Sequence, residues 1–150
     1  MNKSGILILL VMIPWIMSCE VKPQEIIYGQ DACHFCTMLI VDRQHAAEIV
    51  TIKGKAFKYD AIECMMNDLS KWDKPEIIYL LVADYANPDK LVDATNSYFL
   101  ISEAIPSPMG EFLTAFESAG ERRKILQEIN GESLNWIELK EEFNVKQQSR

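Results

Sequence analysis

The fold is decided by residues 54–62, GKAFKYDAI, where a glycine is followed by a strand pattern and then by the start of a helix. Phe57 and Tyr59 alternate with polar residues, so both side chains are expected to point into the core. Asp60 and Glu63 have the spacing of a capping box at a helix start. The helix itself is predicted from apolar residues at helical spacing, which are Ile62, Met65, Met66, Leu69 and Trp72.

Residues 131–139, GESLNWIEL, repeat this order of residue types about 77 residues later: glycine, charged, small, apolar, polar, aromatic and then a helix start. That period is too long for a solenoid, whose repeats span about 20–50 residues. It predicts instead an α+β fold of two small ββα-type halves in tandem. We place these halves at residues 26–84 and 85–143, followed by a C-terminal tail at 144–150.

The remaining elements are predicted from apolar runs and breaker residues. A hairpin is expected around Gly54, and residues 87–89, NPD, are expected to form a turn. Strands are expected at residues 26–28, 37–42, 46–53, 55–59, 76–84, 97–101 and 111–116. Helices are expected between Asp60 and Pro75, over residues 117–130 with Gly131 as the C-cap, and over the last segment to about Phe143.

The N-terminus has the layout of a bacterial secretion signal, in which a positive charge precedes an apolar stretch at residues 5–17. This stretch is short for a membrane-spanning helix. Residues 16–19, IMSC, resemble a lipobox, in which the cysteine is lipidated and becomes the mature N-terminus; an uncleaved anchor helix is the alternative. We expect a signal peptide over 1–18 and a tether over 19–25 that is lipidated at Cys19. The protein would then be a membrane-anchored lipoprotein on the periplasmic side.

Net charge and motifs exclude several classes of function. The formal net charge is −7, whereas nucleic-acid binding requires a basic face. The sequence has no glycine-rich phosphate loop, no HExxH motif and no recognisable Ser-His-Asp arrangement. We therefore predict a protein that is not an enzyme and does not bind nucleic acid.

The candidate chemistry lies in residues 31–42, DACHFCTMLIVD, where Cys33, His34, Cys36 and Met38 occur within six residues. Thiolate and thioether sulfur are soft ligands that select Cu(I) over hard cations. Zinc is usually held by cysteine and histidine and rarely by methionine. Met38 therefore favours a copper site over a zinc site.

The CxxC pair of Cys33 and Cys36 has three possible interpretations: a structural disulfide, a thiol redox pair, or a metal-binding turn. A redox pair normally stands at the start of a helix, whereas residues 37–42 have the pattern of a strand. Together with Cys64, three cysteines follow the lipobox. An odd number outside the cytoplasm indicates a free or ligating thiol, or an intermolecular bond.

Met38 follows Cys36 by two residues on the predicted strand, so both should project to the same side. Cu(I) is satisfied by two or three ligands, and Met109, in the Ser107–Gly110 loop, is the best additional donor. The alternative donors are Cys33, His34 and Cys64. Other residues of these types are assigned to structure: Met65 and Met66 to the core face of the helix, and His45 to the surface.

These features together resemble the NosL family, the lipoprotein copper chaperones of nitrous-oxide reductase maturation. The resemblance covers most of the chain from Cys19 onward. The residues that carry it are Cys36-Thr37-Met38, Asp42, Gly54-Lys55, Tyr59-Asp60-Ala61-Ile62, Cys64-Met65, Tyr98, Ser107-Pro108-Met109-Gly110, Ala115-Phe116 and Gly131.

The resemblance implies a NosL/MerB-like α+β fold, Cu(I) as cargo, and Cys36, Met38 and Met109 as its ligands. It also implies delivery to the nitrous-oxide reductase apoprotein, by ligand exchange, beside a membrane ABC-type maturation complex. The family often has glycine where this chain has Thr37, and Cys33 is not part of the family pattern. Cys33 would either enlarge the site or oxidise with Cys36. A lipid-anchored thiol-disulfide redox protein that uses these two cysteines is therefore the alternative, and a structural lipoprotein with a disulfide is the third interpretation.

Overall fold

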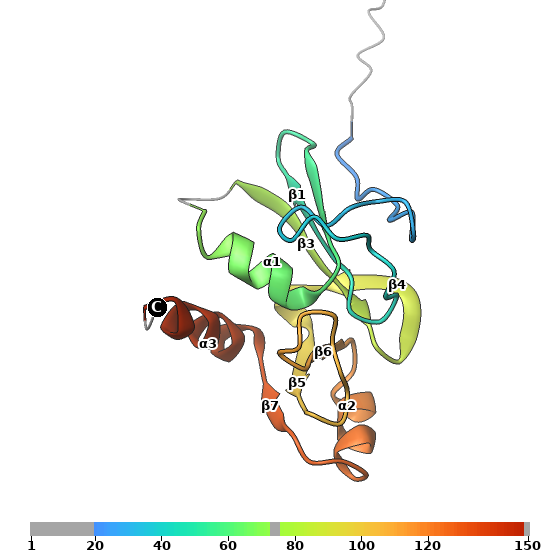
Figure 1. Ribbon diagram of the computed structural model, residues 1–150, viewed down its shortest axis with the longest axis vertical. Helices are drawn as coiled ribbons and strands as arrows, with labels where there is room; N and C mark the ends of the chain where they lie inside the picture. The colour runs from blue at the N-terminus through green and yellow to red at the C-terminus, as the bar shows by residue number, and fades with distance from the viewer. Residues whose placement is uncertain (1–19, 73–75, 149–150) are drawn as a thin grey trace, which may run out of the picture.

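A computed structural model describes residues 20–72 and 76–148 (Figure 1). Its elements in chain order are β1 (Ala47–Thr51), β2 (Ala56–Tyr59), α1 (Ile62–Leu69), β3 (Ile77–Asp84), β4 (Asn87–Asp93), a 3-10 helix (Ala94–Asn96), β5 (Tyr98–Ile101), β6 (Leu113–Phe116), α2 (Ala119–Leu126), β7 (Glu132–Leu134) and α3 (Trp136–Gln148). The predicted signal peptide, Cys19 and Pro75 lie outside the described residues. Within the described ranges, none of the helices has the length and apolar character that a membrane crossing requires.

The first sheet is antiparallel and has the strand order β2-β1-β3-β4, with α1 packed against β1 and β2. The hairpin of β1 and β2 turns at Gly54 as predicted, and the φ of +78° at Gly54 explains why a glycine stands there. Ile49 in the central strand is fully buried. Tyr59 is also fully buried, and Phe57 packs against the same core, as the alternation predicts.

The second sheet has the order β6-β5-β7 and is covered by α2 and α3, which both contact β5. The two sheets share one core, because β3 contacts β6 and α1 contacts α3. A single cluster of buried side chains runs from Ile49 in the first sheet to Phe99 in β5 and Leu139 in α3. In Figure 1, α1 lies over the first sheet and α3 lies beside it.

The two repeated stretches adopt the same local structure. Gly54 precedes β2 and α1, and Gly131 precedes β7 and α3. The predicted α+β class is confirmed, with one glycine-strand-helix unit in each sheet. The first sheet extends through β4 to Asp93, past the boundary at residue 84 that the sequence predicts.

The strands predicted at 26–28 and 37–42 are wrong, because this region forms a loop closed by a single β-bridge. Gly29 and Thr37 have φ values of +77° and +64°, and neither value is compatible with extended chain. The apolar side chains that suggested strands therefore belong to a loop, which is hydrogen-bonded to β2 through the His34 amide and the Lys58 carbonyl.

The turn predicted at 87–89 is also wrong, since these residues begin β4. This strand lies at the edge of the sheet, where a proline is tolerated because its missing N–H leaves no gap in the ladder. Strand β7 is too short to be predicted from the sequence. Its residues are extended because they pair with β5. Helix α3 continues to Gln148, into the tail predicted at 144–150.

Asp60 and Glu63 do not form the predicted capping box. The N-cap of α1 is Ala61, which makes no side-chain cap hydrogen bond. Asp60 instead accepts a hydrogen bond from the Val41 amide at 3.4 Å, which ties the loop to the start of the helix. Glu63 is fully buried and accepts hydrogen bonds from Leu113 in β6 and from Ser107 in the loop before it. Tertiary partners have replaced the local cap in both cases.

Helix α2 is shorter than the predicted 117–130, and Gly131 is not its C-cap. A Cβ atom on Gly131 would lie 2.6 Å from Leu100 Cδ1 and 2.8 Å from the Ile101 carbonyl oxygen. The glycine is therefore required by the close approach of β7 to β5 rather than by a helix end.

We expect Gly131→Ala to destabilise the protein by roughly 1–3 kcal/mol, because the added methyl overpacks against backbone that cannot move aside. Urea unfolding measures this effect. Gly120→Ala is the matched control, because Gly120 lies in α2 and its Cβ would meet only the Oγ of the N-cap residue Ser118, at 3.3 Å. That change should be neutral or stabilising by up to about 1 kcal/mol. Equal losses in both variants would contradict the close-approach explanation.

Candidate metal centre

Cys33, Cys36 and Cys64 form one cluster, with all three Sγ atoms within 4.8 Å of one another. All three are free thiols; Cys33 and Cys64 are buried and Cys36 is half-buried. The first two come from the loop before β1, and Cys64 comes from the first turn of α1. The fold thus brings three soft donors to one point that is accessible through Cys36.

Backbone hydrogen bonds shape the loop that carries two of these thiols. The Thr37 amide donates to the Cys33 carbonyl at 2.9 Å, and the Cys33 amide donates to the Met38 carbonyl at 2.8 Å. The His34 amide donates to the Lys58 carbonyl at 2.8 Å, which holds the turn against β2. Since β2 leads directly into α1, this contact sets the loop thiols beside the first turn of the helix.

Thr37 occupies a backbone conformation that favours glycine, with a φ of +64°. This conformation explains why a glycine suits the position between Cys36 and Met38, and a β-branched residue held there costs about 1–2 kcal/mol. The Thr37 hydroxyl donates to the Cys36 carbonyl at 2.6 Å. Because the chain is not extended here, the argument that places Cys36 and Met38 on the same side of a strand does not apply.

Hydrogen bonds also set the charge of the cluster. They lower the pKa of Cys33 to about 5, chiefly through the bond from the Cys64 thiol and further through the backbone amides of Cys36, Asp60 and Phe35. The pKa of Cys64 is raised, because its thiol is the donor and is buried beside Cys33. Burial raises the pKa of Cys36. At neutral pH the cluster therefore holds one thiolate, the form of cysteine that binds metals, and two thiols.

The other predicted donors have accessible side chains. Met38 is 56% exposed, and its backbone closes the cysteine turn. Met109 is 37% exposed. The His34 side chain lies outside the cluster, with its Nε2 3.9 Å from Asp68 Oδ2 and its ring centroid 4.6 Å from that of Phe57. Met65 and Met66 are buried in the core, as predicted.

Glu63, which precedes Cys64, is a buried carboxylate that the sequence does not identify as part of the site. Its Oε1 accepts hydrogen bonds from the Ser107 hydroxyl and from the Leu113 amide, the latter at 3.2 Å. Burial raises the pKa of Glu63. The one feature of the sequence that suggests this burial is that Glu63 follows Ile62, a residue of the apolar face of the predicted helix.

His45 is buried, which corrects its predicted surface position. Its Nδ1 lies 2.9 Å from Asp42 Oδ2, and its Nε2 lies 3.4 Å from Thr114 Oγ1. The strand β6, which supplies Thr114, comes from the second half and covers this end of the loop. Both ring nitrogens therefore have protein partners, and His45 is a structural residue at the junction of the sheets.

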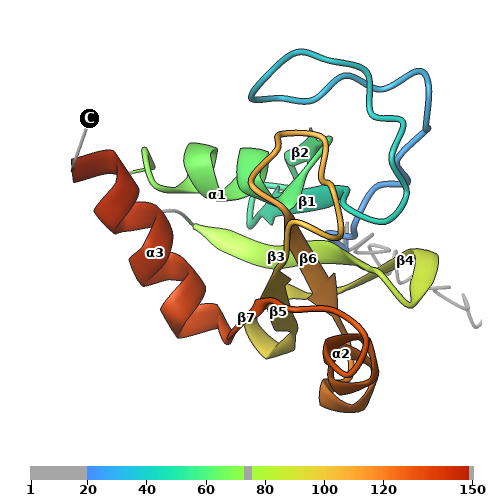
Figure 2. The same cartoon turned by 60° about the horizontal axis from the view of Figure 1, so that its bottom comes forward.

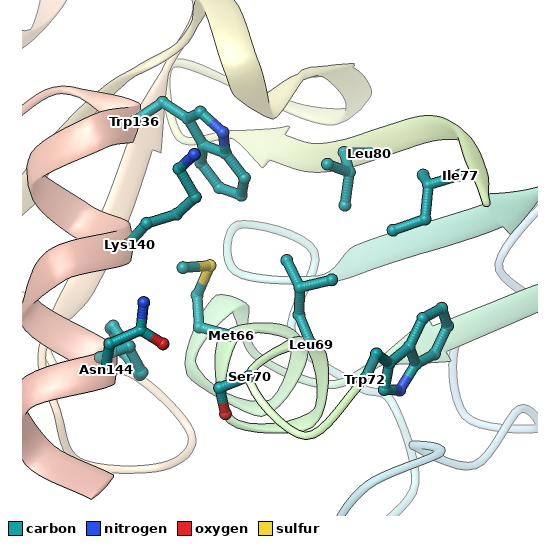
Figure 3. Close-up of a pocket in the computed structure, with 10 residues that line it drawn as sticks. Met66, Leu69, Ser70, Trp72, Ile77, Leu80, Trp136, Lys140 and Asn144 are labelled. Atoms are coloured by element: carbon teal, nitrogen blue, oxygen red, sulfur yellow. The ribbon is translucent and has the colours of Figure 1, made fainter. Parts of the chain in front are cut away.

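Away from the thiol cluster, α1, β3 and α3 enclose a groove of about 420 Å³ (Figure 3). Its walls are mainly apolar, with Met66 and Leu69 facing Leu80 and Trp136, while Lys140 lies at its rim. Among the described residues that line it, none is a cysteine, histidine, aspartate or glutamate. The described lining of the groove offers one soft donor, Met66, whereas the thiol cluster brings three together, so the cluster is the candidate centre.

Two comparisons with known proteins found a match. A family model described as NosL matches residues 24–144. The chain is also similar to the crystal structure of the copper chaperone NosL from Shewanella denitrificans, with a TM-score of 0.68 and 18% sequence identity, over 79% of this chain and 96% of that chain. At this identity the structural match supports the fold. A comparison with curated protein sequences gave no match.

We expect the reduced protein to contain a thiolate that titrates at about pH 5. Because the pKa of Cys33 is lowered to about 5, its thiolate persists above that pH and is protonated below it. A pH titration of thiolate ultraviolet absorbance should show this step. Cys33→Ser should remove it, and Cys36→Ser should keep it. Absorbance that rises only near the ordinary cysteine pKa of about 8.5 would contradict the assignment.

Proposed function

The chain belongs to the NosL family, since the family model covers most of it, and we propose that it is a chaperone that binds Cu(I) and passes it to an acceptor. The observation that carries the proposal is the cluster of three thiols within 4.8 Å. Sulfur donors favour Cu(I) over hard cations such as Mg²⁺ and Ca²⁺. The similar solved structure is described as a copper chaperone, which supports the same cargo here.

The proposed site has a buried part and an accessible part. Cys33 and Cys64 supply the buried sulfur atoms, and Cys36 connects them to the surface. The exposed thioethers of Met38 and Met109 are the outer donors. A methionine cannot form a disulfide, so these donors suit a compartment in which thiols oxidise.

Transfer by ligand exchange follows from this arrangement. Cu(I) is satisfied by two or three ligands, so a thiolate, thioether or imidazole of the acceptor can approach the bound ion. A bond from copper to that group forms as the bond to an accessible donor, Met38 or Cys36, breaks. Copper stays in the +1 state and no electrons are transferred. Binding requires deprotonated thiols, so uptake at neutral pH releases protons from the cluster. This role is exchange rather than catalysis.

The destination that we propose is the nitrous-oxide reductase apoprotein, with a membrane ABC-type maturation complex as the working partner. Membership of the NosL family supports both assignments. The lipobox at residues 16–19 supports a location on the periplasmic side, anchored to the membrane through Cys19. A lipid anchor would keep the copper site near a membrane-bound partner.

We expect the reduced lipoprotein in detergent to bind about one Cu(I) under anaerobic conditions. Cys36→Ser should weaken binding by about 100-fold or more, since even groups outside the ligand set of a metal can change affinity by about 10–100-fold. Met38→Leu should weaken it by about tenfold, which corresponds to about 1.4 kcal/mol. Competition with a chromophoric Cu(I) chelator measures these affinities.

Met66→Leu is the matched control, because Met66 is a buried methionine in the groove and has similar volume to leucine. It should leave Cu(I) affinity unchanged. A reduced wild type that takes up no Cu(I) would overturn the proposed function. Equal affinities for wild type and Met38→Leu would show that the Met38 thioether is not a ligand, while the thiol cluster would remain the proposed site.

We expect the protein taken from membranes to begin at Cys19 and to carry a covalent lipid, because Cys19 is the proposed site of lipidation and of signal-peptide removal. Mass spectrometry of the intact protein measures both. Cys19→Ser should carry no lipid and should keep residues 1–18, whereas the control Cys64→Ser should be processed as the wild type is. A wild type that carries no lipid and keeps residues 1–18 would favour the uncleaved anchor helix.

A further inference from the structure

Glu63 joins α1 to a loop that lies far away in the sequence. The carboxylate is fully buried, and its Oε1 accepts hydrogen bonds from Ser107, 44 residues away, and from the Leu113 amide, 50 residues away. Its Oε2 has no hydrogen-bond partner among the described residues. Burying a carboxylate with incomplete hydrogen bonding is costly, and an apolar residue of similar volume would fill this position at lower cost. Packing alone therefore does not account for a glutamate here.

Both ends of this connection lead to proposed copper donors. On the helix, Glu63 is followed by Cys64, whose Sγ belongs to the thiol cluster. On the other side, Ser107 begins a turn that is closed by the Gly110 amide, which donates to the Ser107 carbonyl at 3.0 Å. Met109 stands at the tip of this turn and is partly exposed.

The same hydroxyl also organises the return of the loop to the second sheet. The Ser107 Oγ accepts a hydrogen bond from the Phe112 amide at 2.9 Å. Gly110 and Phe112 have φ values of +74° and +61°, so the chain reverses sharply between the methionine and β6. In Figure 2 the loop between β5 and β6 reaches the end of α1 that adjoins β2. Its conformation depends on a contact with the helix.

We propose that Glu63 is a positioning residue, which fixes the loop of residues 107–112 to the first turn of α1 so that Met109 reaches copper bound at the thiol cluster. This inference rests on the proposed function. It gives the hydrogen bonds between Glu63 and the second half a role in copper binding. Glu63 does not touch the ion in this scheme. It acts through Ser107 and through the turn that carries Met109.

A double-mutant cycle with Met109 tests this proposal in the full-length lipoprotein in detergent. Glu63→Leu removes both hydrogen bonds to Oε1 but keeps a similar volume, and it should weaken Cu(I) binding by about tenfold in the wild-type background. In the Met109→Leu background the same change should weaken binding by less than about twofold, because the donor that it positions is already gone. Competition with a chromophoric Cu(I) chelator measures all four affinities.

Three further comparisons separate positioning from general loss of structure. In the Met38→Leu background, Glu63→Leu should still weaken binding by about tenfold, since Met38 belongs to a different loop. Ser107→Ala cuts the same connection at a less costly site, and its effect should also disappear when Met109 is leucine. If Glu63→Leu does not fold, Ser107→Ala takes its place in the double-mutant cycle. Glu63→Gln keeps an acceptor oxygen for both donors and should bind Cu(I) within about twofold of wild type.

Losses that are equally large in the wild-type and Met109→Leu backgrounds would overturn the positioning role, because a structural effect acts on every donor alike. In that case a wild type that binds Cu(I) would leave the proposed function standing. A wild type that takes up no Cu(I) would overturn the proposed function and this inference together.

Discussion

Helix α1 presents two adjacent side chains to two different parts of the molecule, and the arrangement of the site depends on this. Successive residues of an α-helix point about 100° apart. Cys64 is therefore able to meet the thiols of the cysteine turn while Glu63 meets the loop between β5 and β6. The helix is held in this orientation by Ile62 and Met65, which are fully buried against the shared core. A rotation of the helix would separate both sets of partners.

Two buried acidic groups, the Cys33 thiol and the Glu63 carboxyl, contribute to this region, and their pKa values are shifted in opposite directions. The thiolate of Cys33 receives hydrogen bonds from the Cys64 thiol and from backbone amides, so its pKa is low and its charge is retained. The Glu63 carboxylate receives hydrogen bonds from Ser107 and Leu113, but these do not offset the cost of burying its charge, so its pKa is raised. A monovalent cation at the cluster would therefore meet one charge that is already present, and only the other ligating thiols would have to release protons.

The differences between prediction and structure have a common cause. Periodic apolar residues predicted elements correctly where those residues enter the core, as in β2, α1 and β5. They failed at residues 37–42, where Leu39 and Val41 are 53% and 65% exposed and the backbone turns at Thr37. The Asn-Pro-Asp pattern was misleading at β4 for a related reason, because proline indicates a turn unless the strand lies at a sheet edge. Edge position and solvent exposure are properties of the assembled fold.

The candidate site divides in the same way. The sequence by itself determined the α+β class, the glycine-strand-helix repeat and the choice of soft sulfur donors, because these depend on residue type and local spacing. Only the tertiary structure decided that Cys64 joins Cys33 and Cys36, and that Glu63 connects the helix to Ser107. Those contacts join residues about 30 to 45 positions apart, and their formation depends on how α1 packs between two sheets. Local spacing carries no information about that packing, because it is settled by the complementary shapes of side chains that meet only in the folded chain.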